Sequence, residues 1–168
     1  NAAMQVIKKD TDIFSGLQEI THEGKFKGDG RKFIQIVPLF DLMDNGNSYW
    51  GTLSNIKATE GDVIIYDGAR RLHFSSQRGD EIKYRREVEG YAAYLRNLPI
   101  DTLFMHVVDT KPVMRNSDTG IAAIFYAVAL SRGLDPKTIN FQYGSLRKSL
   151  RTCLEKETFK DINFSATP

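Results

Sequence analysis

The loop before the most apolar stretch of the chain has the residue types best placed to do chemistry. It reads Val113-Met114-Arg115-Asn116-Ser117-Asp118-Thr119-Gly120-Ile121, and every residue from 121 to 130 is apolar or aromatic. A side chain at position 119 would lie at a helix N-terminus, where backbone N–H groups and the helix dipole favour negative charge. Such a position suits a cysteine thiolate, because the local field lowers the pKa of a thiol. The chain has Thr119 there, and a threonine hydroxyl needs a strong neighbouring base before it can act as a nucleophile.

Few other side chains could supply a base or a nucleophile. The histidines are His22, His73 and His106, and the one cysteine is Cys153. His22 falls in an expected loop, and His106 falls in an expected strand, where a packed or hydrogen-bonded histidine is the commoner case. Cys153 faces inward on the last expected helix, so we interpret it as a small buried hydrophobic residue. None of these residues is expected to activate Thr119.

The elements that would position Thr119 follow from the hydrophobic pattern and the turn residues. Strands are predicted at 33–37 (ending before Pro38), 49–54, 63–66 and 102–108. Helices are predicted at about 84–95, 120–130 and about 145–157. Asp118 or Ser117 is expected to cap the middle helix, and Gly133 followed by Pro136 is expected to end it. The element order α, β-β-β, α-β-α-α indicates an α+β fold, with one antiparallel or mixed sheet packed by helices on both sides.

Composition excludes several classes of function. The chain has 168 residues, enough for one domain, and its 23 Lys and Arg against 21 Asp and Glu give a net charge of only +2. This charge is too small for nucleic-acid binding by bulk electrostatics. A single cysteine excludes an internal disulfide, argues against a cysteine-based zinc site and fits a reducing compartment. No apolar run reaches the length of a membrane span, so no membrane partner is expected. No cofactor is expected either.

A succession of short motifs resembles the SUMO-specific cysteine proteases, most closely the transposon-derived members found in animals. The matching motifs are Asn1-Ala2-Ala3-Met4-Gln5, Gly16-Leu17-Gln18, Gln35-Ile36, Tyr49-Trp50, Val63-Ile64-Ile65-Tyr66-Asp67, Ser117-Asp118-Thr119-Gly120-Ile121, Gly133-Leu134-Asp135-Pro136 and Leu146-Arg147…Leu150…Cys153-Leu154. The resemblance implies a papain-like, adenovirus-protease-like fold with a central mixed sheet. It covers one domain at 1–157, followed by a tail at 158–168. Because Asn1 falls within a family helix motif, the domain is expected to belong to a longer protein.

The resemblance also implies where a catalytic site would be. The family uses a His followed by Trp, an Asp on the next strand, an upstream Gln, and a Cys between Asp and Gly. By this motif match, Tyr49 stands at the His position and Thr119 at the Cys position, whereas Asp67 is retained. The Gln position falls at Val113 or Met114, neither of which donates hydrogen bonds as glutamine does. The resemblance therefore implies a degenerate site with no intact catalytic set.

The sequence is compatible with three hypotheses of function. The first is a pseudoprotease that serves as a protein–protein interaction module in a larger intracellular protein, nuclear rather than cytoplasmic. The second is a module that binds SUMO or ubiquitin without cleaving it, with Trp50 either lining a channel for the substrate tail or packing in the core. The third is a residual isopeptidase that uses Thr119 or an unexpected pair of residues. The identity of a protein partner is not encoded in any motif.

Overall fold

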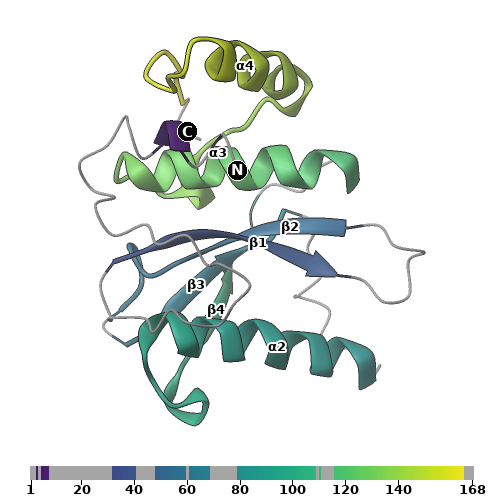
Figure 1. The fold of residues 1–168 in the computed structure, drawn as a ribbon, viewed down its shortest axis with the longest axis vertical. Helices are drawn as coiled ribbons and strands as arrows, with labels where there is room; N and C mark the ends of the chain where they lie inside the picture. The colour runs from purple at the N-terminus through teal and green to yellow at the C-terminus, as the bar shows by residue number, and fades with distance from the viewer. Residues whose placement is uncertain are drawn as a thin grey trace.

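A four-stranded mixed sheet lies between helices that cover both of its faces (Figure 1). The computed structural model describes residues 3, 5–7, 32–40, 48–59, 61–68, 79–108, 110 and 116–164. Its elements are β1 (Ile34–Phe40), β2 (Ser48–Ser54), β3 (Val63–Tyr66), α2 (Gly79–Arg96), the 3₁₀ turn η2 (Ile100–Thr102), β4 (Met105–Val108), the 3₁₀ turn η3 (Asn116–Asp118), α3 (Thr119–Ser131), the 3₁₀ turn η4 (Pro136–Thr138) and α4 (Tyr143–Glu155). The expected α+β fold, a central mixed sheet flanked by helices, is confirmed.

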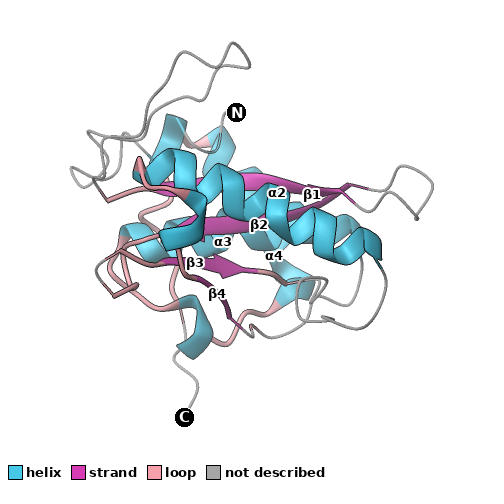
Figure 2. Ribbon diagram, turned by 90° about the horizontal axis from the view of Figure 1, so that it is seen from below, coloured by secondary structure: helices cyan, strands magenta, loops and turns pink. Residues whose placement is uncertain are grey.

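The strand order is β1-β2-β3-β4, with antiparallel pairing from β1 to β3 and parallel pairing between β3 and β4. A parallel pair needs a long crossover connection, and α2 lies in the segment that joins β3 to β4. Figure 2 shows α2 running across the sheet on the face opposite α3. The sheet therefore separates α2 from α3 and α4.

Each face of the sheet has its own apolar core, because successive side chains of a strand point to opposite faces. On the α2 face, the buried residues include Tyr49, Leu53, Val63 and Ile65 from β2 and β3. On the α3 face, Ile34 and Tyr66 pack with the buried residues of α3. The direction in which a β2 side chain points thus decides which helix it can reach.

Helix α3 is buried on nearly all sides because it forms a middle layer between the sheet and α4 (Figure 1). Its residues from Phe125 to Ser131 are all buried, which explains why the sequence shows no polar stripe along this helix. The expected end is confirmed: Gly133 adopts a positive φ of 72° just after the helix, and Pro136 follows.

Two predicted strand boundaries and one predicted cap were wrong. Strand β1 continues through Pro38, which pairs with Trp50, because β1 is an edge strand where proline's missing N–H is tolerated. The strand predicted at 102–108 begins only at Met105, since the residues before it form the 3₁₀ turn η2. Asp118 stands at the N-cap position of α3, but its side chain makes no capping hydrogen bond.

The packed unit continues beyond residue 157. Phe159 is buried in the same core as α3, and Ile162 and Phe164 pack against that core. Arg132, just after α3, donates hydrogen bonds to the backbone carbonyls of Phe159 and Ile162. Residues 158–164 therefore pack on the same layer as α3. In the described ranges, no helix combines the length and apolar character that crossing a membrane requires.

Candidate functional site

The first turn of α3 is joined to β2 at the position where sequence reasoning placed the degenerate nucleophile. Thr119 is the first residue of α3 and is 1% exposed. Its Oγ1 accepts a hydrogen bond from the backbone N–H of Trp50, with an N···O distance of 3.3 Å. The hydroxyl is thus enclosed and holds a backbone donor, which is a structural contact.

A second hydroxyl makes the complementary contact one helical turn further along. Thr52 is fully buried, and its Oγ1 donates to the carbonyl oxygen of Ala123 at 2.7 Å. Trp50 and Thr52 are two residues apart on β2, and Thr119 and Ala123 are four residues apart on α3, so both pairs lie on facing sides of the two elements. Sequence reasoning missed Thr52, although the period-two spacing from Trp50 was available as a signal.

The indole of Trp50 covers the next residue of α3. A Cβ added at Gly120 would lie 3.3 Å from Cδ1 of Trp50, so only glycine leaves ordinary room for the ring. Trp50 is nevertheless 38% exposed. One side of the ring therefore packs on α3, and part of it faces solvent, while a role of Trp50 in lining a channel stays a prediction.

Tyr49 and Thr119 are not brought together. Tyr49 is buried in the cluster on the α2 face, together with Leu53 and Val63. Thr119 lies on the other face of the sheet, where Trp50 and Thr52 contact α3. A side chain at position 49 thus points away from the hydroxyl that a catalytic base would have to reach.

Asp67, at the retained family position, directly follows β3 and is fully buried. The preceding residue, Tyr66, pairs in register with Thr52 on β2. Sequence position therefore places Asp67 at the end of the sheet near Trp50.

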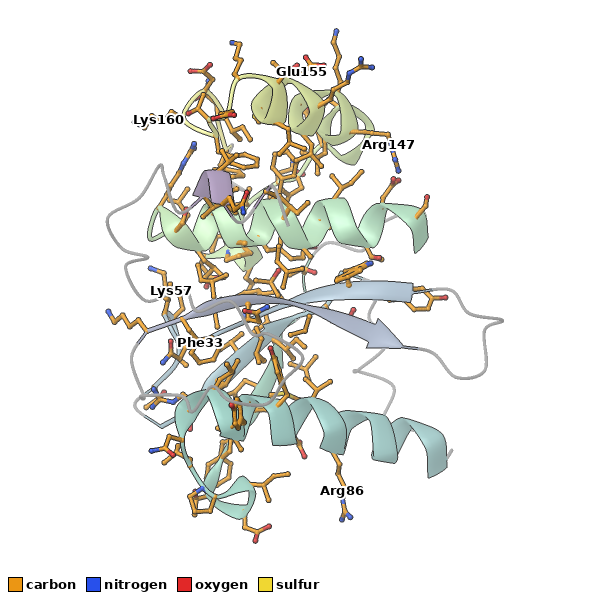
Figure 3. The ribbon with its side chains drawn as sticks, in the orientation of Figure 1. Phe33, Lys57, Arg86, Arg147, Glu155 and Lys160 are labelled. Carbon is orange, nitrogen blue, oxygen red and sulfur yellow. The ribbon has the colours of Figure 1, made fainter. Side chains whose placement is uncertain are left out.

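An ion pair from α4 braces the residues just before Thr119. Arg147 of α4 pairs with the carboxylate of Asp118 and also reaches the carbonyl oxygen of Ser117, at 3.5 Å. Figure 3 shows the Arg147 side chain extending from α4 toward α3. This explains why Asp118 does not cap α3: its carboxylate is turned toward the guanidinium. The sequence gives no local signal for this pair, because its two residues are 29 positions apart.

The remaining candidates lie elsewhere. His106 of β4 pairs through Nε2 with Oδ2 of Asp62 at 2.8 Å. Asp62 precedes β3, whereas the register places Trp50 beyond the other end of β3. Cys153 is buried on α4, as predicted. His22, His73, Val113 and Met114 lie outside the described residues. Within the described ranges, no three side chains of His, Cys, Asp or Glu gather where they could hold a metal ion.

Comparison with known proteins adds one distant likeness. No family model matches the chain, and no curated protein matches it. A solved structure titled "Crystal structure of the de-sumoylating protease" is similar over 75% of this chain, with a TM-score of 0.43 and 16% sequence identity. This chain spans 56% of that protein's length. The likeness concerns the fold alone and assigns neither a substrate nor an activity.

Proposed function

We propose that this chain is a catalytically inactive SUMO-protease-like domain that acts as a protein–protein interaction module. The observation that supports inactivity best is the state of Thr119. Its hydroxyl is buried and accepts the Trp50 N–H, and a tyrosine on the far face of the sheet stands where the family has its histidine. The degenerate motifs at positions 49 and 119 support the same proposal. The proposed setting is a larger intracellular, nuclear protein.

The chemistry of a threonine at this position supports inactivity as well. A hydroxyl proton must pass to a base within hydrogen-bond reach before the oxygen can attack a carbonyl carbon. The Trp50 amide N–H that bonds to Thr119 Oγ1 is a donor and cannot take a proton. A residual isopeptidase would therefore need a rearranged first turn of α3.

Reaction with electrophilic probes tests this proposal. SUMO and ubiquitin carrying a reactive group at the C-terminus would be incubated with the chain, and adducts would be sought by mass spectrometry. We expect no adduct on Thr119, because its hydroxyl is buried and bonded to the Trp50 amide. The buried Cys153 should remain unlabelled unless the chain is denatured, which serves as an internal control. An adduct on Thr119 would refute the proposal.

A non-cleaving module that binds SUMO or ubiquitin is the second candidate, and the exposed part of Trp50 favours it. Trp50 is one of the few large hydrophobic residues of the described chain with a substantial exposed surface. Titration of each protein against the labelled chain, followed by NMR, separates the two candidates. Shifts at Trp50 and Gly120 in the micromolar range would favour this alternative. Their absence at high micromolar concentration would leave the partner to be sought elsewhere.

A further inference from the structure

A groove lies between α4 and the segment 158–164, away from the Thr119 site. It encloses about 380 Å³, and neither Thr119 nor Trp50 lines it. Its floor includes Phe125 of α3 and Cys153 of α4, both buried. A volume of this size falls within the usual range of ligand sites and accommodates a few side chains of a bound segment.

The wall formed by the C-terminal segment is held in place by contacts with α3 and its own aromatic rings. Arg132 donates to the carbonyls of Phe159 and Ile162, and its guanidinium lies 5.3 Å from the ring centre of Phe164. The Phe164 ring meets Phe141 edge-on, with 5.8 Å between centroids. Because the wall is fixed before any ligand arrives, binding would cost little ordering of the protein.

The rim of the groove is polar and basic. Ser145, Ser149 and Thr152 follow one face of α4, and the charged lining residues are Lys148, Lys156 and Asp161, two cations against one anion. Lys156 is paired with Asp161 at 3.2 Å, whereas Lys148 has no ion pair with any residue that the structure describes. Residues 137–164 carry six Lys and Arg against three Asp and Glu, so this end of the molecule is positive although the whole chain is nearly neutral.

We propose that this groove binds a short acidic segment of a partner protein, which inserts one apolar or aromatic side chain between α4 and the segment 158–164. The apolar floor would take the anchor, and Lys148 would pair with a carboxylate beside it. The inference deepens the proposed interaction role and rests on it in taking the ligand to be a protein. It does not depend on whether Thr119 is inactive.

Two features favour a peptide over other ligands. The groove is partly open to solvent and combines apolar residues with hydroxyl and amide groups, which suits a side chain plus adjoining backbone. The positive rim complements carboxylates and would also speed the encounter with an acidic segment. Nucleic acid would instead require a broad phosphate-tracking surface, and two rim lysines beside an apolar floor do not make one.

Selection from a displayed library of random peptides against the full chain tests the proposal. We expect enrichment of peptides that place an aromatic or large aliphatic residue next to Asp or Glu. Affinities of the enriched peptides would then be measured by fluorescence anisotropy for Lys148→Glu and for the matched variant Arg151→Glu. Arg151 is also on α4, but its side chain is 82% exposed, pairs with Glu155 and does not line the groove.

Lys148→Glu should weaken binding by about tenfold, and Arg151→Glu should leave it within about twofold, because only the first charge lies on the rim. Ser149→Trp fills the groove from an α4 position and should abolish binding. Equal loss in both charge variants would show general attraction to a basic surface and would overturn the proposal. So would failure to enrich acidic peptides, or binding that survives Ser149→Trp. Circular dichroism melts of each variant would establish that it is folded.

These outcomes are distinct from failure of the proposed function. An adduct on Thr119 would refute the proposed inactivity and would not bear on the proposal for the groove. Loss of the groove proposal would leave inactivity and SUMO or ubiquitin binding near Trp50 open to their own measurements.

Discussion

At the residue scale, the decisive contact is the hydrogen bond between the Trp50 backbone and the Thr119 hydroxyl. The sequence was sufficient to predict that position 119 begins a buried helix, because the polar loop and the apolar run are adjacent. It could not predict the acceptor role of the hydroxyl, since that depends on how far β2 reaches along α3. The sequence also lacked the position of β2 relative to the two helix layers, so Tyr49 could be matched by motif but not assigned to a face of the sheet.

Replacing the hydroxyl with a methyl group should reveal its structural role. Thr119→Val keeps the shape but leaves the Trp50 N–H without this acceptor, so we expect the free energy of unfolding to fall by about 1–3 kcal/mol. Urea denaturation measures the change. Thr102→Val is the control, because the Thr102 hydroxyl bonds to Pro99 on the exposed surface. If both variants were equally stable, the contact at Thr119 would not be structural.

The packing of Trp50 on Gly120 should be visible in fluorescence, because Trp50 is the only tryptophan of the chain. Gly120→Ala places a Cβ 3.3 Å from the indole, so we expect the half-exposed ring to shift and its emission to change. Gly144→Ala, where an added Cβ meets nothing within 4 Å, should leave the emission unchanged. Identical spectra for Gly120→Ala and the wild type would contradict this arrangement.

At the scale of elements, the sheet and α3 are joined by paired hydroxyl contacts, and α4 is joined to the start of α3 by an ion pair. Hydrophobic periodicity predicted which segments form strands and helices, and β2, β3 and α3 lie where they were expected. The continuation of β1 through Pro38 was not readable, because it depends on β1 being at the edge of the sheet. Contacts between α4 and α3 could not be predicted either, because the residues that make them are far apart in the sequence.

Loss of the ion pair should loosen the start of α3 without unfolding the chain. We expect Arg147→Ala to speed amide hydrogen exchange in residues 117–120, while the free energy of unfolding changes by less than about 1 kcal/mol because the pair is partly exposed. Arg151→Ala removes an equally charged side chain from the same helix and should not affect that turn. Unchanged exchange in Arg147→Ala would show that the pair does not brace α3.

At the scale of the whole molecule, two cores on opposite faces of the sheet each contain a tyrosine with a raised pKa. Burial, with a smaller contribution from Tyr94, raises the pKa of Tyr91 from 10.0 to about 12. Burial also raises the pKa of Tyr66, and the negative charge of Asp135 adds to this effect. Chain length predicted one domain but could not show that its core is divided by the sheet.

These tyrosines should make the fold sensitive to alkali. From about pH 10 upward, the unfolded chain loses tyrosine protons that the folded chain retains, so the unfolded state binds fewer protons and stability falls toward pH 12. Thermal melts across this range should show the fall, and Tyr91→Phe should reduce its steepness. A wild-type melting temperature with the same pH dependence as Tyr91→Phe would contradict the effect of burial on Tyr91.

The most direct test of the central claim is the rate at which the chain releases a fluorophore from SUMO and ubiquitin conjugates. We expect no release above background from the wild type, because the Thr119 hydroxyl is buried against an amide donor. We expect none from the double variant Tyr49→His, Thr119→Cys, because position 49 faces the α2 core. Release by the wild type that Thr119→Ala abolishes, or activity restored in the double variant, would contradict this account.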